Sequence, residues 1–382
     1  MSLLLNEDQL MLQDAARGFC QQQAPVSQMR KLRDSKDPDG FDRKLWQQMV
    51  ELGWAGMPIS EAYGGFGFGY GGLGIVLEES GRNLVCSPLI ATALLGAAAI
   101  NELGTDEQKQ KLLPAIINGE LLLALALDET PIHQPGQIKT CALPDGGDFV
   151  LSGSKCFVLD GHVADKLIVV ARSDGDVSDA AGISVFLVDA DSNGLEINRT
   201  SMVDSRNSAT VVLNDVRVTA GCLLGEPGAA GPQLQRVLDI GRIGLAAEML
   251  GSVQQAFDVT VEYLKQREQF GVAIGAFQGL QHRAATMYSE IELARSLVRA
   301  ALAALDDGSK TDREIAELAS MCKAKLSEVF FLVSNEAIQM HGGVGMTDEF
   351  DIGFYLKRAR VAQQFLGDAV FHRDRIATLN GF

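Results

Sequence analysis

Basic residues are scarce in this chain of 382 amino acids. It holds 33 lysines and arginines against 49 aspartates and glutamates, which gives a formal net charge of −16. Binding to nucleic acid needs clustered basic side chains that neutralise phosphates, so this balance excludes a nucleic-acid partner. A small anionic ligand is compatible with the charge wherever a few basic residues gather locally.

Cysteine and histidine are also few and widely spaced. The six cysteines include no CxxC pair, and no two of them are closer than fifteen residues. Such spacing favours reduced thiols in a cytoplasm over a disulfide framework. The five histidines show no HExxH or similar ligand spacing, so we expect no metal site. We expect His133 to be an exposed loop residue.

Long hydrophobic runs are absent. The longest run of low polarity, "LIATALLGAAAI" at residues 89–100, is far shorter than the roughly 20 residues that a bilayer span requires, and we expect a buried helix there. The opening "MSLLLNEDQL" carries acidic residues where a secretory signal would carry basic ones. We therefore expect a cytoplasmic protein without a membrane span.

Helical periodicity dominates the chain up to about residue 120. "NEDQLMLQDAARGFCQQQ" begins with Asn6, a suitable N-cap, and repeats apolar residues at steps of three and four. "DRKLWQQMVELGWAG" has the same period and reaches a stop signal at Gly53. Seven glycines interrupt the helices in "EAYGGFGFGYGGLG" (residues 61–74). Because no strand precedes them, an interhelical loop is favoured over a nucleotide-binding loop.

Residues 121–231 change to the pattern of strands and turns. β-Branched runs such as "DKLIVVARS" and "GISVFLVDA" are separated by glycine, aspartate and asparagine. No helical segment of useful length lies between them, which favours an antiparallel barrel or sandwich.

Proline is absent from the last 150 residues, after Pro232. That stretch has four long helical segments, at residues 233–267, 278–306, 312–340 and 349–377, and a four-helix bundle is the simplest arrangement for them. The sequence therefore predicts a multi-domain α+β protein. It consists of an N-terminal helical domain (1–120), a middle β domain (121–231) and a C-terminal helical bundle (232–382).

Two motifs in the predicted bundle carry a resemblance to a known family. They are "RxxFG…FQ…QH" at 267–282 and "QMHGGVG" at 339–345, and "EAYGGFGFGYG", "IKT" and "LSGSKCFV" fall at corresponding places. Together with the domain order, they make the whole chain resemble the acyl-CoA dehydrogenase family. The resemblance implies a tetramer built from dimers, with FAD at the dimer interface, which desaturates a CoA thioester between its α and β carbons. A carboxylate removes the α proton, and the electrons usually pass to an electron-transferring flavoprotein.

The resemblance also implies that each FAD is shared between two subunits. One subunit holds the flavin ring, while the neighbour's bundle holds the adenosine and diphosphate. Arginine pairs with diphosphate oxygens, and glycine lets backbone N–H groups approach them closely. The residues that match this second role are Arg267, Phe270, Gln278, Gln339, Gly342 and Gly343. The alternative is a solvated Arg267 at a helix end and an ordinary turn in "HGGVG".

The resemblance fails at the catalytic base. The family carries its carboxylate either in a Tyr-Glu-Gly motif near the C-terminus or before an arginine on the first bundle helix. The corresponding residues here are Leu366, in "QQFLGDA", and Gly241, in "DIGRIG". Neither side chain can take up a proton, so the sequence assigns no catalytic residue to this chain.

Two threonines that serve the flavin ring in the family are replaced as well. Leu127 aligns with the first and Leu159 with the second, and Phe157 takes the place of the family's tryptophan. The chain thus keeps the residues that act on a neighbour's cofactor and is apolar where its own flavin ring would bind. This division resembles non-catalytic subunits of heterotetrameric members that degrade sterol side chains and other bulky acyl-CoAs.

Three functions follow from these observations. The favoured one is a non-catalytic subunit that completes the FAD site of a catalytic acyl-CoA dehydrogenase homologue in an α₂β₂ heterotetramer, with the acyl-CoA bound mainly by that partner. The second is a self-sufficient homotetramer with a non-standard base, Asp368 or Asp239. The third is a flavin-free binding or scaffold protein that uses the same fold.

Overall fold

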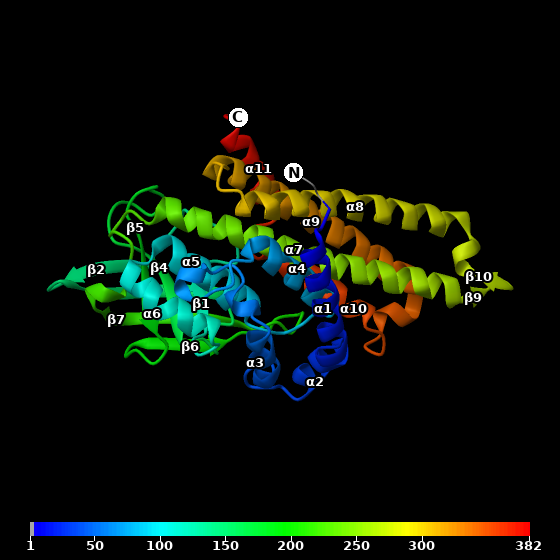
Figure 1. Cartoon of the computed structure of the whole chain (residues 1–382), viewed down its shortest axis with the longest axis horizontal. Coiled ribbons are helices and arrows are strands. Elements are labelled where there is room, and N and C mark those ends of the chain that lie inside the picture. The colour runs from blue at the N-terminus through cyan, green and yellow to red at the C-terminus, as the bar shows by residue number, and fades with distance from the viewer. Residues whose placement is uncertain (1–3) are drawn as a thin grey trace. The chain divides into compact units, whose positions relative to one another are not determined.

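The computed structural model of the chain describes residues 4–382 (Figure 1). Contacts divide the chain into two compact units. The bundle unit comprises the chain up to Asp34, Tyr70–Val85 and Arg242–Phe382, and the sheet unit comprises Ser35–Gly69 and Cys86–Gly241. Residues 1–3, with which the predicted first domain begins, lie outside the described part. The three domain boundaries stay predictions.

Helices make up nearly all of the bundle unit. Asn6 is the N-cap of the first helix, as predicted, because its side chain accepts a hydrogen bond from the backbone N–H of Gln9 at 2.8 Å. A short hairpin of β9 (Glu268–Gln269) and β10 (Val272–Ala273) connects the two longest antiparallel helices. The helices are α1 (Glu7–Gln23), α2 (Val26–Asp34), α4 (Gly69–Arg82), most of α7 (Gly231–Gln266), α8 (Gln278–Asp306), α9 (Asp312–His341), α10 (Ile352–Gln364) and α11 (Ala369–Leu379).

The last predicted helix is in fact two helices. The expectation of one helix over residues 349–377 was wrong, because α10 ends at Gln364 and α11 begins at Ala369. Between them Leu366 (φ +60°) and Gly367 (φ +101°) have positive φ angles that a right-handed helix cannot contain. The Asp368 side chain then caps α11 by accepting from the backbone N–H of Phe371 at 2.8 Å. The break falls where the resemblance expects a catalytic carboxylate.

The sheet unit combines one eight-stranded sheet with short helices. The buried helix expected at residues 89–100 is confirmed: a π-helical segment, η3 (Leu89–Gly96), continues into α5 (Ala97–Leu103). The other helices are α3 (Arg43–Glu51) and α6 (Asp106–Ile117). The strands are β1 (Leu123–Ala126), β2 (Cys141–Asp145), β3 (Asp148–Leu159), β4 (Lys166–Arg172), β5 (Ile183–Asp189), β6 (Leu195–Arg199), β7 (Ser208–Val218) and β8 (Leu223–Leu224).

The sheet is mainly antiparallel. Its strand order is β6-β7-β3-β2-β4-β5-β8, with β1 paired to β4. The prediction of antiparallel pairing does not hold for β1, which runs parallel to β4, nor for the single pair between β2 and β4. The β2–β3 hairpin lies between β1 and β4 in the sequence. After this hairpin, β4 runs in the same direction as β1. Buried residues of β4, β5 and β7, including Leu167, Phe186 and Val211, form the core of this unit.

The glycine-rich segment is a loop up to Phe68 and a helix from Gly69 onwards. At the start of α4, the backbone N–H groups of Tyr70 and Gly71 donate to the Asp306 carboxylate at 2.7 and 2.8 Å. Burial raises the pKa of Asp306. The N-terminus of α4 therefore binds a carboxylate of the chain itself. The interhelical loop predicted for residues 61–74 ends at Phe68, and the prediction is wrong for residues 69–74, which are helical.

Helices α4 and α7 touch backbone to backbone within the bundle unit. A Cβ atom at Gly251 of α7 would lie 1.7 Å from the carbonyl oxygen of Glu78, and one at Gly81 of α4 would lie 2.0 Å from that of Glu248. Glycine at both positions is therefore a packing requirement. Neither clash can be relieved by rotating a side chain, because the opposing atoms belong to the main chain.

Replacing Gly251 with alanine is expected to destabilise the protein by about 1–3 kcal/mol or more, since the two helices must separate. Urea unfolding followed by circular dichroism measures this. Gly18→Ala in α1 is the matched control, because nothing lies within 4 Å of its Cβ position. That change should stabilise the helix by about 0.5–1 kcal/mol. Equal stability of the two variants would contradict the close contact of α4 and α7.

Candidate functional site

The two motifs that resemble a nucleotide site meet at one end of the bundle unit. Arg267 directly follows α7, Phe270 lies in the turn of the β9–β10 hairpin, and Gln278 begins α8. Gln339 lies in the last turn of α9, which Gly342–Met346 continues as a 3₁₀ turn. The Tyr263 ring of α7 stacks on the His341 ring of α9 at 4.3 Å, and its hydroxyl donates to the His341 carbonyl at 3.4 Å. The structure thus brings both motifs together.

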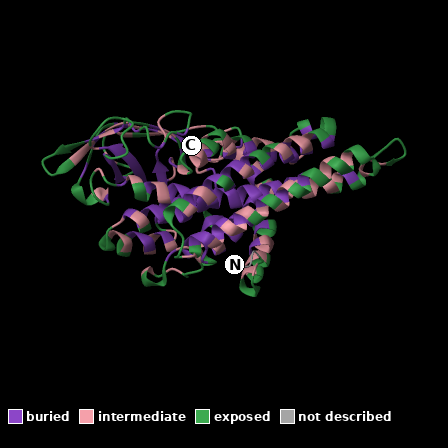
Figure 2. Cartoon of the chain, turned by 90° about the horizontal axis from the view of Figure 1, so that it is seen from above, coloured by how far each residue is buried: buried purple, intermediate pink, exposed green. Residues whose placement is uncertain are grey.

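This end of the bundle is exposed (Figure 2). Phe270 is 93% exposed and has a φ angle of +56°. Gly342 has a φ angle of +63°, and nothing lies within 4 Å of a Cβ atom built there or at Gly343. In the part of the chain that the structure describes, the Arg267 guanidinium has no carboxylate partner. An exposed cation and an open glycine turn at the same end of the bundle unit can accommodate an external phosphate group.

The break between α10 and α11 is held by buried nitrogen donors from three helices. Arg242 of α7 donates from Nε to the carbonyl oxygen of Leu366 at 3.2 Å, and His372 of α11 lies with Nε2 3.0 Å from the same oxygen. Lys323 of α9 donates from Nζ to the carbonyl oxygen of Gly367 at 2.7 Å. It also donates to that of Gln363 at 3.1 Å. These contacts fix the backbone of the break.

Burial sets the protonation of this cluster. Burial, with a contribution from the charge of Arg242, lowers the pKa of Lys323 from 10.5 to about 7. Burial also lowers the pKa of His372 to about 2, with contributions from Arg242 and Lys323. His372 is therefore neutral at physiological pH, with its proton on Nε2 and directed at the Leu366 carbonyl.

The two positions that match the family's catalytic base carry no titratable side chain. Leu366 is apolar and buried, and Gly241 lies inside α7 without a side chain. The Asp368 carboxylate caps α11. Asp239, the other candidate carboxylate, is a buried residue of α7 in the sheet unit.

The two positions expected to contact a flavin ring are buried in the sheet unit. Leu127 directly follows β1, and its carbonyl oxygen accepts from Lys155 Nζ at 3.0 Å. Lys155 also pairs with Glu129 at 2.8 Å, and burial lowers the pKa of this lysine although Glu129 opposes the shift. Leu159 ends β3 opposite Ser208 of β7. Neither leucine offers a hydrogen bond from its side chain.

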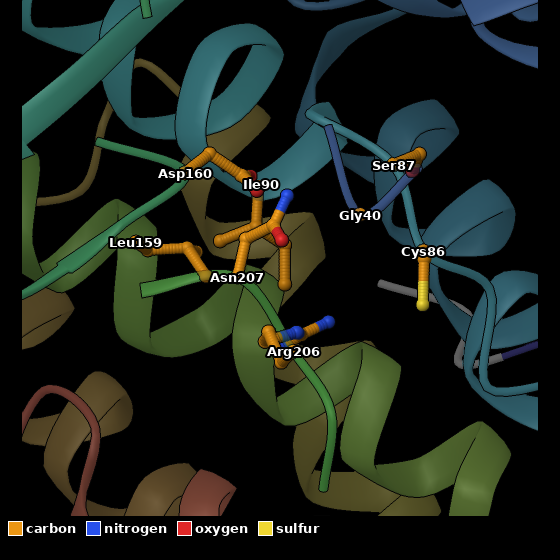
Figure 3. A pocket seen from close by; sticks show the side chains of 8 residues that line it. All are labelled: Gly40, Cys86, Ser87, Ile90, Leu159, Asp160, Arg206 and Asn207. Atoms are coloured by element: carbon orange, nitrogen blue, oxygen red, sulfur yellow. The ribbon is translucent and has the colours of Figure 1, made fainter. Parts of the chain in front are cut away.

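A small cavity lies beside Leu159 within the sheet unit (Figure 3). Its volume is about 10 Å³, which is enough for one water molecule. Figure 3 shows Leu159 and Cys86 on opposite sides of it, with Arg206 and Asn207 between them. The cavity is far too small to hold an aromatic ring system.

Three family models match consecutive parts of the chain. They describe the N-terminal domain of acyl-CoA dehydrogenase (residues 6–120), its middle domain (133–216) and its C-terminal domain (231–379). The chain is also 33% identical to the probable acyl-CoA dehydrogenase YngJ of Bacillus subtilis, over 99% of each chain.

This chain belongs to the acyl-CoA dehydrogenase family.

Solved structures agree with this assignment to the acyl-CoA dehydrogenase family. One is a variant of the Tcur3481–Tcur3483 steroid ACAD, with 33% identity, 98% coverage of each chain and a TM-score of 0.87. Another is butyryl-CoA dehydrogenase from Megasphaera elsdenii, with 29% identity, 99% coverage of each chain and a TM-score of 0.90. The predicted order of a helical, a β and a second helical domain is confirmed.

The sequence reasoning missed several buried polar residues of this acyl-CoA dehydrogenase family chain. His133 is not an exposed loop residue: it is buried, and its Nδ1 lies 3.0 Å from both carboxylate oxygens of Asp128. Lys323 stands four residues after Ala319 and three before Leu326, both buried. That spacing places it on the core face of α9, so the signal for its burial was present in the sequence.

Residues 4–382 contain no group of three or more metal-ligating side chains and no helix long and apolar enough to cross a membrane. All six cysteines are free thiols.

Replacing Lys323 with methionine should leave the Gly367 and Gln363 carbonyls unpaired. At about pH 8.5 we expect a loss of about 1–3 kcal/mol in the free energy of unfolding. The unfolded lysine keeps its proton up to about 10.5, whereas the folded one releases it near 7. The wild type therefore gains stability over the variant as the pH rises above 7, by at most about 1.4 kcal/mol per pH unit.

Urea unfolding at several pH values between about 6 and 9 measures this difference, because the range above pH 7 lies between the folded and the unfolded pKa. Lys325→Met is the control on the same helix, because it loses only a partly exposed pair with Glu290. Its effect should stay below about 1 kcal/mol. A Lys323→Met effect as small as the control's, or one that does not change with pH, would refute the account of this cluster.

Proposed function

We propose that this chain is the non-catalytic subunit of an FAD-dependent acyl-CoA dehydrogenase, in an α₂β₂ heterotetramer with a catalytic homologue. The observation that carries the proposal is the α10–α11 break. Leu366 occupies the place of the catalytic carboxylate, and buried donors from three helices hold its backbone.

Active members of the family need a base for the α proton, while bound FAD accepts the hydride. Leu366 cannot serve as that base, and the Asp368 carboxylate is engaged as the N-cap of α11. Arg242 and Lys323 donate hydrogen bonds to carbonyl oxygens, and neutral His372 directs its proton at the Leu366 carbonyl. The low pKa of His372 makes its other nitrogen a poor proton acceptor. Thioester desaturation is therefore assigned to the partner.

The residues of this chain fit one half of FAD and not the other. Arg267 and the Gly342–Gly343 turn are open to solvent and suit the diphosphate, with Gln278 and Gln339 as further polar contacts. Phe270 offers an exposed ring. Leu127 and Leu159 supply no polar side-chain contact to a flavin ring, and the cavity beside Leu159 has a volume of only about 10 Å³. These residues would therefore hold the adenosine and diphosphate of a cofactor whose ring lies in the partner.

The remaining assignments follow from the same proposal. The name of the Tcur3481–Tcur3483 steroid ACAD joins two proteins, which supports a heteromeric assembly here. A bulky acyl-CoA held mainly by the partner would be the substrate, and an electron-transferring flavoprotein the acceptor. Free cysteines suit a cytoplasmic location.

The self-sufficient enzyme is less favoured, because the Asp368 carboxylate caps α11.

Expression with and without the catalytic homologue tests the proposal. The chain purified alone should carry little FAD and desaturate no acyl-CoA, because its ring positions are apolar. The co-purified complex should be yellow and active. Stoichiometric FAD on the chain expressed alone, together with turnover of a CoA thioester, would rule the proposal out.

Arg267→Ala should weaken FAD binding in the complex, although the flavin ring lies in the partner. Loss of a charge-assisted contact of roughly 1.5–3 kcal/mol corresponds to about a ten- to hundredfold lower affinity. FAD retention after gel filtration measures the effect. Arg313→Ala is the control, because this exposed arginine of α9 pairs with Glu317. If both variant complexes retain FAD equally, Arg267 does not contact the diphosphate.

A further inference from the structure

Four residues of the Gly342–Met346 turn are exposed, and Gly345 is buried against Ile338 and His341 of α9. Nothing lies within 4 Å of the Cβ positions of Gly342 and Gly343, and Met346 is 77% exposed. Before the turn, His341 is fixed by its stack on Tyr263 and lies 4.8 Å from the Phe350 ring. The conformation of the exposed part of this turn depends on what holds its two ends, because exposed backbone is little constrained by packing.

The end after the turn is held by α2, which lies more than 300 positions earlier in the sequence. Arg33 forms a bidentate salt bridge with the Asp348 carboxylate, in which each hydrogen bond is 2.7 Å long. Arg30 donates from Nε to Asp351 at 2.7 Å and from Nη1 to the Asp348 carbonyl at 2.5 Å. Only Thr347 separates Asp348 from the turn.

An aromatic platform holds the two arginines in place. The guanidinium carbons of Arg30 and Arg33 lie 4.3 and 5.0 Å from the centroid of the buried Phe354 ring. A single exposed ion pair contributes little to stability, but a bidentate arginine–carboxylate pair within a network can contribute more. The α2 clamp is defined here as Arg30, Arg33, Asp348, Asp351 and Phe354. All five residues belong to the bundle unit.

We infer that Arg30 and Arg33 are positioning residues for the Gly342–Met346 turn. The clamp fixes the end of the turn that follows the glycines, and the His341 stack fixes the other end. The glycine backbone is thereby held in a defined shape before a nucleotide arrives. The role of this turn in holding FAD rests on the proposed function.

The test uses Arg33→Met in the complex with the catalytic homologue. Methionine keeps an apolar stem over Phe354 and removes the two bonds to Asp348. Hydrogen exchange of residues 342–351 should become faster while α9 and α10 keep their protection. FAD should dissociate about two- to fivefold faster, the range expected for a partly exposed ion pair. Raising NaCl from about 0.05 M to about 0.5 M should reduce the difference in FAD dissociation rate between the variant and the wild type, because salt screens exposed ion pairs.

Two further variants make the result specific. Arg33→Lys keeps the charge without the planar fork and should give an intermediate dissociation rate. Arg313→Met, which removes an exposed pair at the far end of α9, should change neither exchange of residues 342–351 nor FAD dissociation. Unchanged exchange of residues 342–351 in Arg33→Met would overturn the inference, as would faster exchange with unchanged FAD dissociation. A wild-type complex without FAD would overturn the proposed function instead, and this is visible before any variant is made.

Discussion

The bundle unit depends on three nitrogen donors that point at one stretch of main chain. Arg242, Lys323 and His372 come from different helices and donate to the carbonyl groups of the α10–α11 break. Buried cations are costly unless they are hydrogen-bonded, and buried carbonyls are costly unless they find donors. Here the buried nitrogen donors and the buried carbonyl groups are hydrogen-bonded to each other. The positive φ angle of Leu366, unusual for a branched side chain, persists because the surrounding contacts determine it.

This constraint shapes what the chain can do. Hydrogen bonds hold the backbone of the break in place. The side chain at the family's base position, Leu366, can neither donate nor accept a proton. At the end of the bundle unit that carries the nucleotide-like motifs, the exposed Arg267 guanidinium has no carboxylate partner among residues 4–382. A net charge of −16 makes an unpaired, exposed guanidinium at such a turn notable, since acidic partners are abundant. The apolar Leu366 at the break and the exposed Arg267 together suit a subunit that holds part of a cofactor for another chain.

Local patterns predicted much of the fold. The Asn6 cap, the strand runs of the sheet unit and the buried helix at residues 89–103 follow from short-range periodicity and capping chemistry. The break at Leu366 was missed because "FLGD" continues an apolar helical pattern. Its left-handed residues are stabilised by donors more than 40 positions away on α7 and α9. The parallel pairing of β1 and the burial of His133 were likewise missed, because both depend on contacts between separated segments.

The most direct test of the division between the two chains is the number of flavins in the assembly, measured by native mass spectrometry before and after flavin release. In a heterotetramer, the partner's ring site meets the exposed end of this chain, while the leucines of this chain meet the partner. Two flavins per four chains are therefore expected. Four flavins per four chains, with one bound against Leu159, would contradict the account.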